Sequence, residues 1–319
     1  MKTATKISLV LISIVVVLAL ALGVFLMFRS GDEEEVDPHE GQVYINDGFG
    51  MVWMTPLEGV PVNPLHPSDF KILNNQPSFT SDGYTVTRGI DVSEHQHEID
   101  WSLASRKIDY AYIRLGYRGY TEGGVFEDPY FVPNMKGARE NGLQTGVYFF
   151  SQAISVEEAV EEAEFVIKKL KNFDVDLPVV YDWEKIEGGA RTDVVTPELL
   201  NECALAFCSK IEEAGYEAAV YFNRYIGYYM YDLSKLTDYE FWLAVPGDHP
   251  DFYYATQMWQ YTFDAKIPGI STPTDMNLRL IPDVPLEIPE KPQEEKKENK
   301  RDSQDEYADL PIVEFKNNT

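Results

Sequence analysis

The feature that most constrains the fold is an alternation of short β-rich runs with helical or loop segments, which begins near Thr87. Eight such runs can be counted, at Arg88–Val92, Asp109–Gly116, Gln144–Ser151, Leu177–Glu184, Ala218–Asn223, Glu240–Val245, Thr256–Thr262 and Asp275–Leu280. Strands that alternate with helices predict a parallel sheet, and eight of them predict an α/β barrel. We therefore expect an α/β fold with a TIM-like barrel over residues 87–281.

Helices are predicted between the early strands. They cover Pro129–Asn141, Ser155–Lys171 and Pro197–Ala214. Ser155 is a favoured N-cap residue, and Thr196 before a proline is a typical helix start. The last three predicted strands have no long helix between them, so we expect an incomplete helical ring.

An uncharged run of 22 residues, from 7 to 28, lies near the amino end. This run exceeds the ~20 residues that a transmembrane helix needs. Lysines precede it and four acidic residues at 32–35 follow, so the positive-inside rule predicts that residues 1–6 are cytoplasmic and the rest lies outside. A secreted protein is the alternative, because Ala19-Leu20-Ala21 fits a signal-peptide cleavage site, although the apolar run continues past it.

The segments that flank the predicted barrel differ from it in composition. Residues 29–86 are expected to form an extracytoplasmic spacer, in which residues 43–54 fit a small β-hairpin. The sequence leaves open whether this spacer packs on the barrel or forms a stalk cap. Residues 282–319 combine prolines with a charged run and are predicted to be a disordered tail.

The charge balance excludes several classes of partner. The chain has 53 acidic and 27 basic residues, a net charge of −26. Nucleic acids and anionic lipid surfaces are bound through clustered Lys and Arg, so neither is expected as a partner. The acidic pairs Glu157-Glu158 and Glu161-Glu162 on one predicted helix are interpreted as a face that aids solubility.

Acidic residues at the ends of predicted strands point to chemistry. Asp91 lies at the end of the first strand, Asp182 and Glu184 at the end of the fourth, and Asp275 at the start of the eighth. Side chains alternate along a strand, so positions 182 and 184 share one face. Two carboxylates at one concave mouth raise at least one pKa, and a protonated carboxylic acid can cleave a glycoside. The alternative is a surface pair bound to Arg114 or a neighbouring lysine.

Short motifs run through the same stretch in a fixed order. They are Gly89-Ile90-Asp91-Val92-Ser93-x-x-Gln96, Ile99-Asp100-Trp101, Tyr112-Ile113-Arg114, Gly146-Val147-Tyr148-Phe149-Phe150, Asp182-x-Glu184, Phe241-Trp242-Leu243-Ala244, Trp259-Gln260-Tyr261 and Asp275-x-Asn277. Their order and spacing over residues 87–280 resemble the glycoside hydrolase family 25 lysozymes, the Chalaropsis-type muramidases. The resemblance implies an irregular (β/α)5(β)3 barrel that cleaves the β-1,4 bond between N-acetylmuramic acid and N-acetylglucosamine in peptidoglycan.

The resemblance also implies roles for the acidic residues. Glu184 would be the general acid, and Asp182 would orient the substrate's N-acetyl group in a substrate-assisted, retaining mechanism. Asp91 and Asp275 would complete the catalytic site. Direct displacement by an activated water stays open, because carboxyl separations cannot be measured in a sequence.

The remaining candidates are sugar-binding residues. Aromatic rings near strand ends can stack on pyranose faces, and polar groups beside them can bind hydroxyls. The candidates are Tyr117, Tyr148, Trp242, Trp259 and Tyr261, together with Arg114, Gln260 and Asn277. Core packing is the competing interpretation for each aromatic.

The expected partners are peptidoglycan glycan strands and, through residues 7–28, the cytoplasmic membrane. No cofactor is expected, and no metal, because His95 and His97 lack a third ligand at suitable spacing. Two other functions stay open: a catalytically silent wall-binding protein and a hydrolase of another amino-sugar polymer.

Overall fold

The computed structural model describes residues 22, 37–74, 76–186 and 188–287 of the 319-residue chain. Among these residues, no helix is both long enough and apolar enough to cross a bilayer. The predicted membrane segment, apart from Leu22, lies outside the described residues, as does the predicted tail beyond residue 287.

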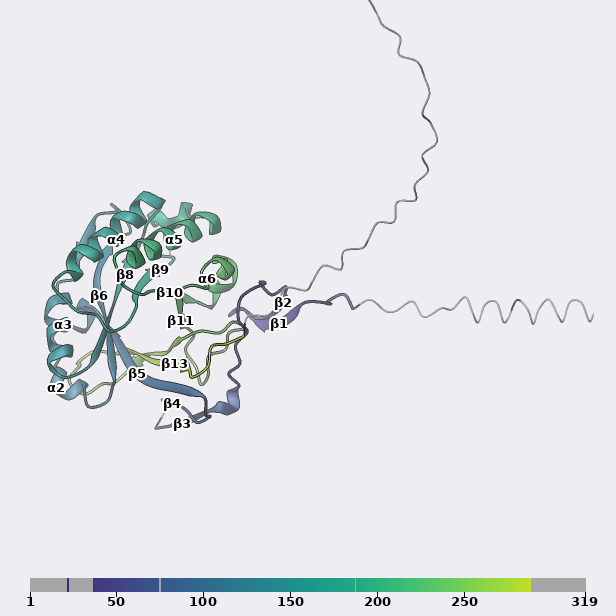
Figure 1. The fold of residues 1–319 in the computed structure, drawn as a ribbon, viewed down its shortest axis with the longest axis horizontal. Coiled ribbons are helices and arrows are strands. Elements are labelled where there is room, and N and C mark those ends of the chain that lie inside the picture. Colours follow the sequence, from purple (N-terminus) through teal and green to yellow (C-terminus); the bar gives the residue numbers. More distant parts are fainter. Residues whose placement is uncertain (1–21, 23–36, 75, 187, 288–319) are drawn as a thin grey trace, which may run out of the picture. The chain divides into compact units, whose positions relative to one another are not determined.

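Eight strands close into a barrel (Figure 1). They are β5 (Tyr84–Val92), β6 (Tyr110–Arg118), β8 (Gln144–Ser151), β9 (Val179–Trp183), β10 (Ala218–Asn223), β11 (Glu240–Ala244), β12 (Met258–Ala265) and β13 (Thr274–Pro282). Their hydrogen-bonded order is β5-β13-β12-β11-β10-β9-β8-β6, and pairing of β6 with β5 closes the ring. All eight predicted strands are confirmed, with shifted ends. A short strand, β7 (Val125–Glu127), pairs with β6 outside the ring.

Strand direction explains how both ends of the barrel sequence reach one mouth. Neighbouring strands are parallel from β5 through β6 and on to β12. In contrast, β13 is antiparallel to both of its neighbours. Asp275, near the start of β13, therefore pairs with Asp91, near the end of β5.

The helices are α2 (Trp101–Ala104), α3 (Phe131–Glu140), α4 (Val156–Leu170), α5 (Pro197–Glu213) and α6 (Arg224–Tyr229). The three long predicted helices are confirmed. Ser155 and Thr196 cap α4 and α5 through their side chains, as expected. Figure 1 shows α3, α4 and α5 on one side of the barrel. In the described part of the chain, no α-helix lies between β11 and β13, so the helical ring is incomplete.

The described part of the predicted spacer packs on the barrel. It contains two antiparallel hairpins, β1 (Val43–Asn46) with β2 (Met51–Met54), as predicted, and β3 (Phe70–Leu73) with β4 (Gln76–Phe79). The Phe70 ring lies edge-on to Trp259, with centroids 5.5 Å apart. This contact places β3 against strand β12, so the described part of the spacer packs on the barrel, which the sequence left open.

Side chains fill the interior of the barrel. The inner cluster consists of Tyr110, Tyr112, Leu177, Val180, Ala219, Trp242 and Met258. Two glycines make room for two of its rings: a Cβ on Gly89 would lie 2.2 Å from the Tyr110 ring, and a Cβ on Gly146 2.4 Å from the Tyr112 ring. Because side chains fill the interior, a ligand would have to bind at the barrel mouth.

The acidic pairs on α4 are not simply a solvated face. Glu162 is fully buried, and its Oε1 accepts a hydrogen bond from Arg118 Nε at 2.6 Å. Both terminal nitrogens of Arg191 donate to the Glu158 carboxylate. The solubility interpretation is therefore wrong for these two glutamates, since arginines from distant segments neutralise them.

Candidate active site

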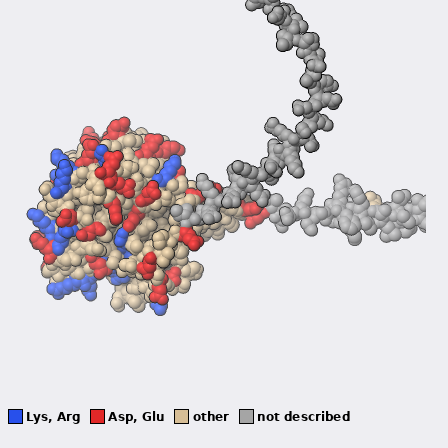
Figure 2. All heavy atoms as spheres, viewed as in Figure 1, with Lys and Arg blue, Asp and Glu red and all other residues tan. Residues whose placement is uncertain are grey.

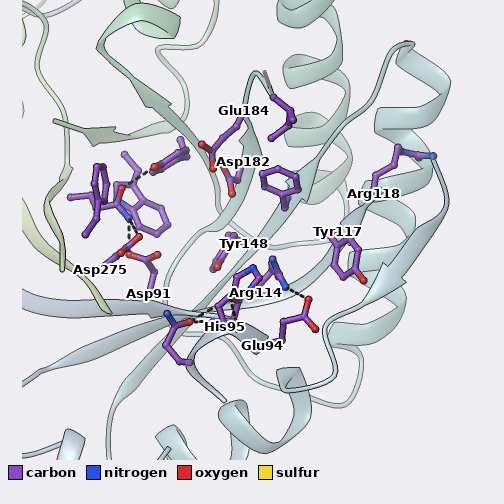
Figure 3. A pocket seen from close by; sticks show the side chains of 18 of the residues that line it. Asp91, Glu94, His95, Arg114, Tyr117, Arg118, Tyr148, Asp182, Glu184 and Asp275 are labelled. Carbon is purple, nitrogen blue, oxygen red and sulfur yellow. Dashed lines mark hydrogen bonds and ion pairs between the residues drawn. The ribbon is translucent and has the colours of Figure 1, made fainter. Parts of the chain in front are cut away.

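A cleft of about 680 Å³ opens at the mouth of the barrel. All four predicted acidic residues line it. They are Asp91, Asp182, Glu184 and Asp275 (Figure 3). The ring of strands thus brings together the acidic residues that are farthest apart in the predicted site.

Asp182 and Glu184 project from the end of β9 into this cleft (Figure 3). Val180 lies on the same face in the inner core, whereas Tyr181 and Trp183 pack in the outer layer, so the predicted alternation is confirmed. Asp182 is 5% exposed, and its Oδ1 has no hydrogen-bond partner among the described residues. Burial therefore removes water from Asp182 Oδ1 without supplying a hydrogen-bond donor in its place.

Arg114 does not neutralise this pair, contrary to the alternative weighed from the sequence. Its Nε donates to Asp128 Oδ2 at 2.7 Å, and its Nη2 donates to Glu94 Oε1 at 2.9 Å. The guanidinium lies over the Tyr117 ring, 5.0 Å from its centroid. Asp128 is buried, and no strand or motif pattern in the sequence marked it.

Burial and mutual repulsion shift the titration of the β9 pair. Burial, followed by the charges of Glu184 and Asp91, raises the pKa of Asp182 well above its ordinary value. Burial and the charge of Asp91 also raise the pKa of Glu184. A carboxyl group with a raised pKa can stay protonated near neutral pH and donate a proton.

Asp91 and Asp275 form the facing acidic pair. Asp91 Oδ2 accepts from Gln260 Nε2 at 2.9 Å and from Asn277 Nδ2 at 2.8 Å, while Gln260 Nε2 also donates to Asp275 Oδ2 at 3.1 Å. Burial raises the pKa of Asp91 to about 6, although the hydrogen bonds from the side-chain amides of Asn277 and Gln260 oppose the shift. Burial and the Asp91 charge raise the pKa of Asp275 to about 8.

Aromatic side chains form much of the cleft wall. Tyr117, Tyr148 and Trp242 all line it, as the sequence predicted. Trp242 Nε1 donates to Asn277 Oδ1 at 2.8 Å, which fixes the indole ring. Tyr221, which was not among the predicted binding residues, also lines the cleft, and its hydroxyl donates to Gln260 Oε1 at 2.8 Å. Alternation along β10 was a usable signal, because it places this tyrosine on the inner face.

Three predicted binding residues do not line the cleft. Trp259 is fully buried, and its Nε1 donates to the Val245 carbonyl at 2.7 Å. Tyr261 is buried in the same outer layer. Alternation explains the correction, since Gln260 between them faces inward. Asn277 is also fully buried and acts on the cleft only through Asp91 and Trp242.

Within the described ranges, no group of three or more His, Cys, Asp or Glu side chains is placed to hold a metal ion. His95 lines the cleft, whereas His97 packs edge-on to Tyr130 outside it.

A comparison with known protein families shows to which family the chain is related. The family described as glycosyl hydrolases family 25 matches residues 90–270, more than half of the chain. The chain belongs to glycosyl hydrolase family 25. It is accordingly a glycoside hydrolase, and its family match lies within the predicted barrel of residues 87–281.

Three proteins that resemble this family 25 enzyme share between 22% and 26% of its residues over the matched region. The uncharacterized protein YegX of Escherichia coli K12 is 26% identical over 211 residues, 61% of this chain and 70% of YegX. The autolytic lysozyme of Clostridium acetobutylicum is 23% identical over 193 residues, 60% of this chain and 55% of the lysozyme. The autolysin LytC from Streptococcus pneumoniae, solved with a synthetic peptidoglycan ligand, superposes with a TM-score of 0.55 at 22% identity, covering 75% of this chain and 56% of LytC. The likeness to LytC shows a shared fold.

Proposed function

We propose that this enzyme is a peptidoglycan hydrolase that cleaves the β-1,4 bond between N-acetylmuramic acid and N-acetylglucosamine. The observation that carries the proposal is the group of four carboxylates in one aromatic-walled cleft, none of them in an ion pair with a described Lys or Arg. Raised pKa values suit the acid-catalysed cleavage of a glycosidic bond. The autolytic lysozyme and LytC, solved with a peptidoglycan ligand, support a wall glycan as the substrate.

In the proposed reaction, Glu184 gives its proton to the glycosidic oxygen as the bond to the anomeric carbon breaks. Asp182 orients the N-acetyl group of the substrate, and the acetamido oxygen forms the new bond to the anomeric carbon. Water then opens this intermediate, and Glu184 takes up the proton of the water. Retained configuration at the anomeric carbon, measured by NMR of fresh products, would support this route over direct attack by water.

The other cleft residues hold the substrate in this proposal. Asp91 and Asp275 bind sugar hydroxyls or water and bias the pKa values of the β9 pair. Tyr117, Tyr148, Tyr221 and Trp242 offer rings to sugar faces, with Arg114 and Gln260 as polar contacts. Trp259, Tyr261 and Asn277 do not touch the substrate in this proposal and only support the residues that line the cleft.

We further propose that residues 7–28 anchor the enzyme in the cytoplasmic membrane, with the catalytic domain of residues 87–281 outside. Residues 29–86 then join the anchor to the barrel, and residues 282–319 form a tail. Fractionation of cells and the intact mass of the recovered enzyme test this arrangement. A soluble product cleaved near residue 21 would support the secreted form instead.

The decisive experiment compares Glu184→Gln with wild type on purified cell walls. Loss of a general acid lowers the rate by roughly 10²–10⁴-fold, while the enzyme still sediments with walls. Glu157→Gln, the same change at an exposed glutamate of α4, is the matched control. Mass spectrometry of the new reducing ends identifies the bond: muramic acid ends support the proposal, and glucosamine ends contradict it.

A further inference from the structure

Gln152 connects the proposed general acid to a neighbouring strand. It directly follows β8 and is fully buried. Its Nε2 donates to the backbone carbonyl of Glu184 at 2.8 Å and to the Ser151 carbonyl at 2.9 Å. Its Oε1 accepts from the Thr192 hydroxyl at 3.3 Å. One buried amide thus joins the ends of β8 and β9 at the cleft.

Arg191 holds Gln152 from the opposite side. Its Nη1 donates to the backbone carbonyl of Gln152 at 3.0 Å. Its two terminal nitrogens also donate to the Glu158 carboxylate, at 2.8 and 2.6 Å. Its backbone amide donates to the Tyr120 carbonyl at 3.1 Å. A Cβ on Gly123 would lie 2.6 Å from the guanidinium carbon and would displace this group, and the φ of +72° at Gly123 also favours glycine.

Arg118 extends the network to the turn that follows β6. This arginine is 3% exposed. It donates to Glu162 at 2.6 Å, to Glu161 at 2.8 Å and to the Gly123 carbonyl at 2.8 Å. Charged hydrogen bonds in a buried setting are strong and directional, so they fix the segments that they join.

We propose that Gln152 is a positioning residue for Glu184, and that Arg118 and Arg191 secure it by tying three loops at the barrel mouth to α4. The described residues of these loops are 119–124, 152–155, 184–186 and 188–195. This inference rests on the proposed function, because it takes Glu184 as the general acid. A fixed backbone keeps the acid at one distance from the glycosidic oxygen, on which its efficiency depends.

Arg139 provides a matched comparison at the other end of the same strands. Its Nη1 donates to Thr145 Oγ1 at 3.0 Å and to Asp176 Oδ2 at 2.8 Å. It therefore joins the start of β8 to the segment before β9, as Arg191 joins their ends. Loss of Arg139 removes a similar ion pair far along these strands from the cleft, and it separates general loosening of the barrel from misplacement of Glu184.

The test uses the full chain with Gln152→Met, Arg191→Met and Arg139→Met. Gln152→Met keeps the side-chain length and removes the amide. We expect kcat on purified peptidoglycan to fall on the order of 10- to 100-fold with little change in KM. Arg191→Met should act in the same direction but less, and it serves as the second measurement if Gln152→Met does not fold. Arg139→Met should lower the unfolding temperature and leave kcat near the wild-type value.

The pH profile gives a second readout. The titratable groups that influence Glu184 or are influenced by it are Asp91, Asp182, Tyr221 and Asp275. Without its backbone anchor, Glu184 gains solvent, so its pKa falls and the alkaline limb of kcat moves to lower pH. An unmoved limb in Gln152→Met, or an equal kcat loss in Arg139→Met, would overturn the positioning role. Glucosamine ends from the wild type would contradict the proposed bond alone, because positioning is judged from the ratio of variant to wild type.

Discussion

Two groups of carboxylates lie close together at the barrel mouth and differ in their partners. The cleft carboxylates are Asp91, Asp182, Glu184 and Asp275. The α4 carboxylates are Glu158, Glu161 and Glu162. The α4 carboxylates bind Arg118 and Arg191, whereas those cleft carboxylates that form side-chain hydrogen bonds accept them from amides.

A nearby cation distinguishes the α4 carboxylates from the cleft carboxylates, although it does not by itself offset burial, since burial raises the pKa of Glu162 to about 7 in spite of Arg118. Arg191 holds the pKa of Glu158 below its ordinary value although burial opposes the shift. Asp182 has no such partner, and burial raises its pKa well above its ordinary value. A buried carboxylate without a cation retains a proton that can be transferred.

The largest expected effect comes from removing a cation from the α4 group. Arg118→Met leaves Glu162 buried and unpaired, so we expect a loss of about 3–5 kcal/mol in the free energy of unfolding. Denaturant unfolding measures it. The double variant Arg118→Met/Glu162→Met should recover much of the loss, since it removes the orphaned charge. A double variant no more stable than the single one would break the comparison.

The reverse change in the cleft should separate activity from stability. Asp182→Asn removes a carboxyl group that must take up a proton when the chain folds at pH 7, because its pKa is raised well above the ordinary value, so the unfolding temperature at that pH should rise. Its activity should fall by about 10²-fold, close to 2.7 kcal/mol in activation free energy. Cell-wall clearing and thermal unfolding of the same preparation test both signs. A lower unfolding temperature would contradict the raised pKa of Asp182, because it would mean that the folded protein favours the ionised form of this carboxyl group.

The pH dependence of stability should follow the cleft group. The folded pKa of Asp91 is raised to about 6 and that of Asp275 to about 8, from an ordinary value of 3.8. Above pH 3.8 the unfolded chain has lost protons that the folded chain still holds, so the contribution of these groups is complete below that pH and declines as pH rises toward 8. Urea unfolding at pH 5, 6.5 and 8 measures the decline. Asp275→Asn should flatten it, and an unchanged slope would contradict the assignment.

Much of the fold was predictable because it depends on local patterns. β-rich runs located the eight strands, and the caps at Ser155 and Thr196 located the starts of α4 and α5. Alternation along β9 placed Asp182 and Glu184 together without any knowledge of tertiary structure.

The remaining features depend on contacts between distant segments. Strand direction is absent from local pattern, so the antiparallel β13 had to be observed. Side-chain alternation along β12 places Trp259 and Tyr261 on the face opposite to Gln260, but their position in a family motif favoured the prediction that they bind sugar. Both rings lie in the outer core. The partner of Glu162 lies 44 residues away in the chain, and no spacing rule connects it to Arg118.

The smallest effect concerns exposed acidic side chains. Figure 2 shows them spread across the visible face of the described residues, in a chain of net charge −26. Repulsion from an anionic wall polymer should slow encounter at low salt, so kcat/KM should rise severalfold as ionic strength increases to about 0.1 M, where the Debye length is about 10 Å.

Added salt also distinguishes the buried charges of the α4 and cleft groups from the exposed charges of the surface. Buried pairs are screened much less than exposed charges, so the stability loss of Arg118→Met should be nearly the same at low and moderate salt while the wild-type rate changes. Measuring both quantities in one salt series separates the charges that fix the structure from those that only set the encounter rate. A rate that falls steadily with added salt would mean that attraction, rather than repulsion, governs the approach to the wall.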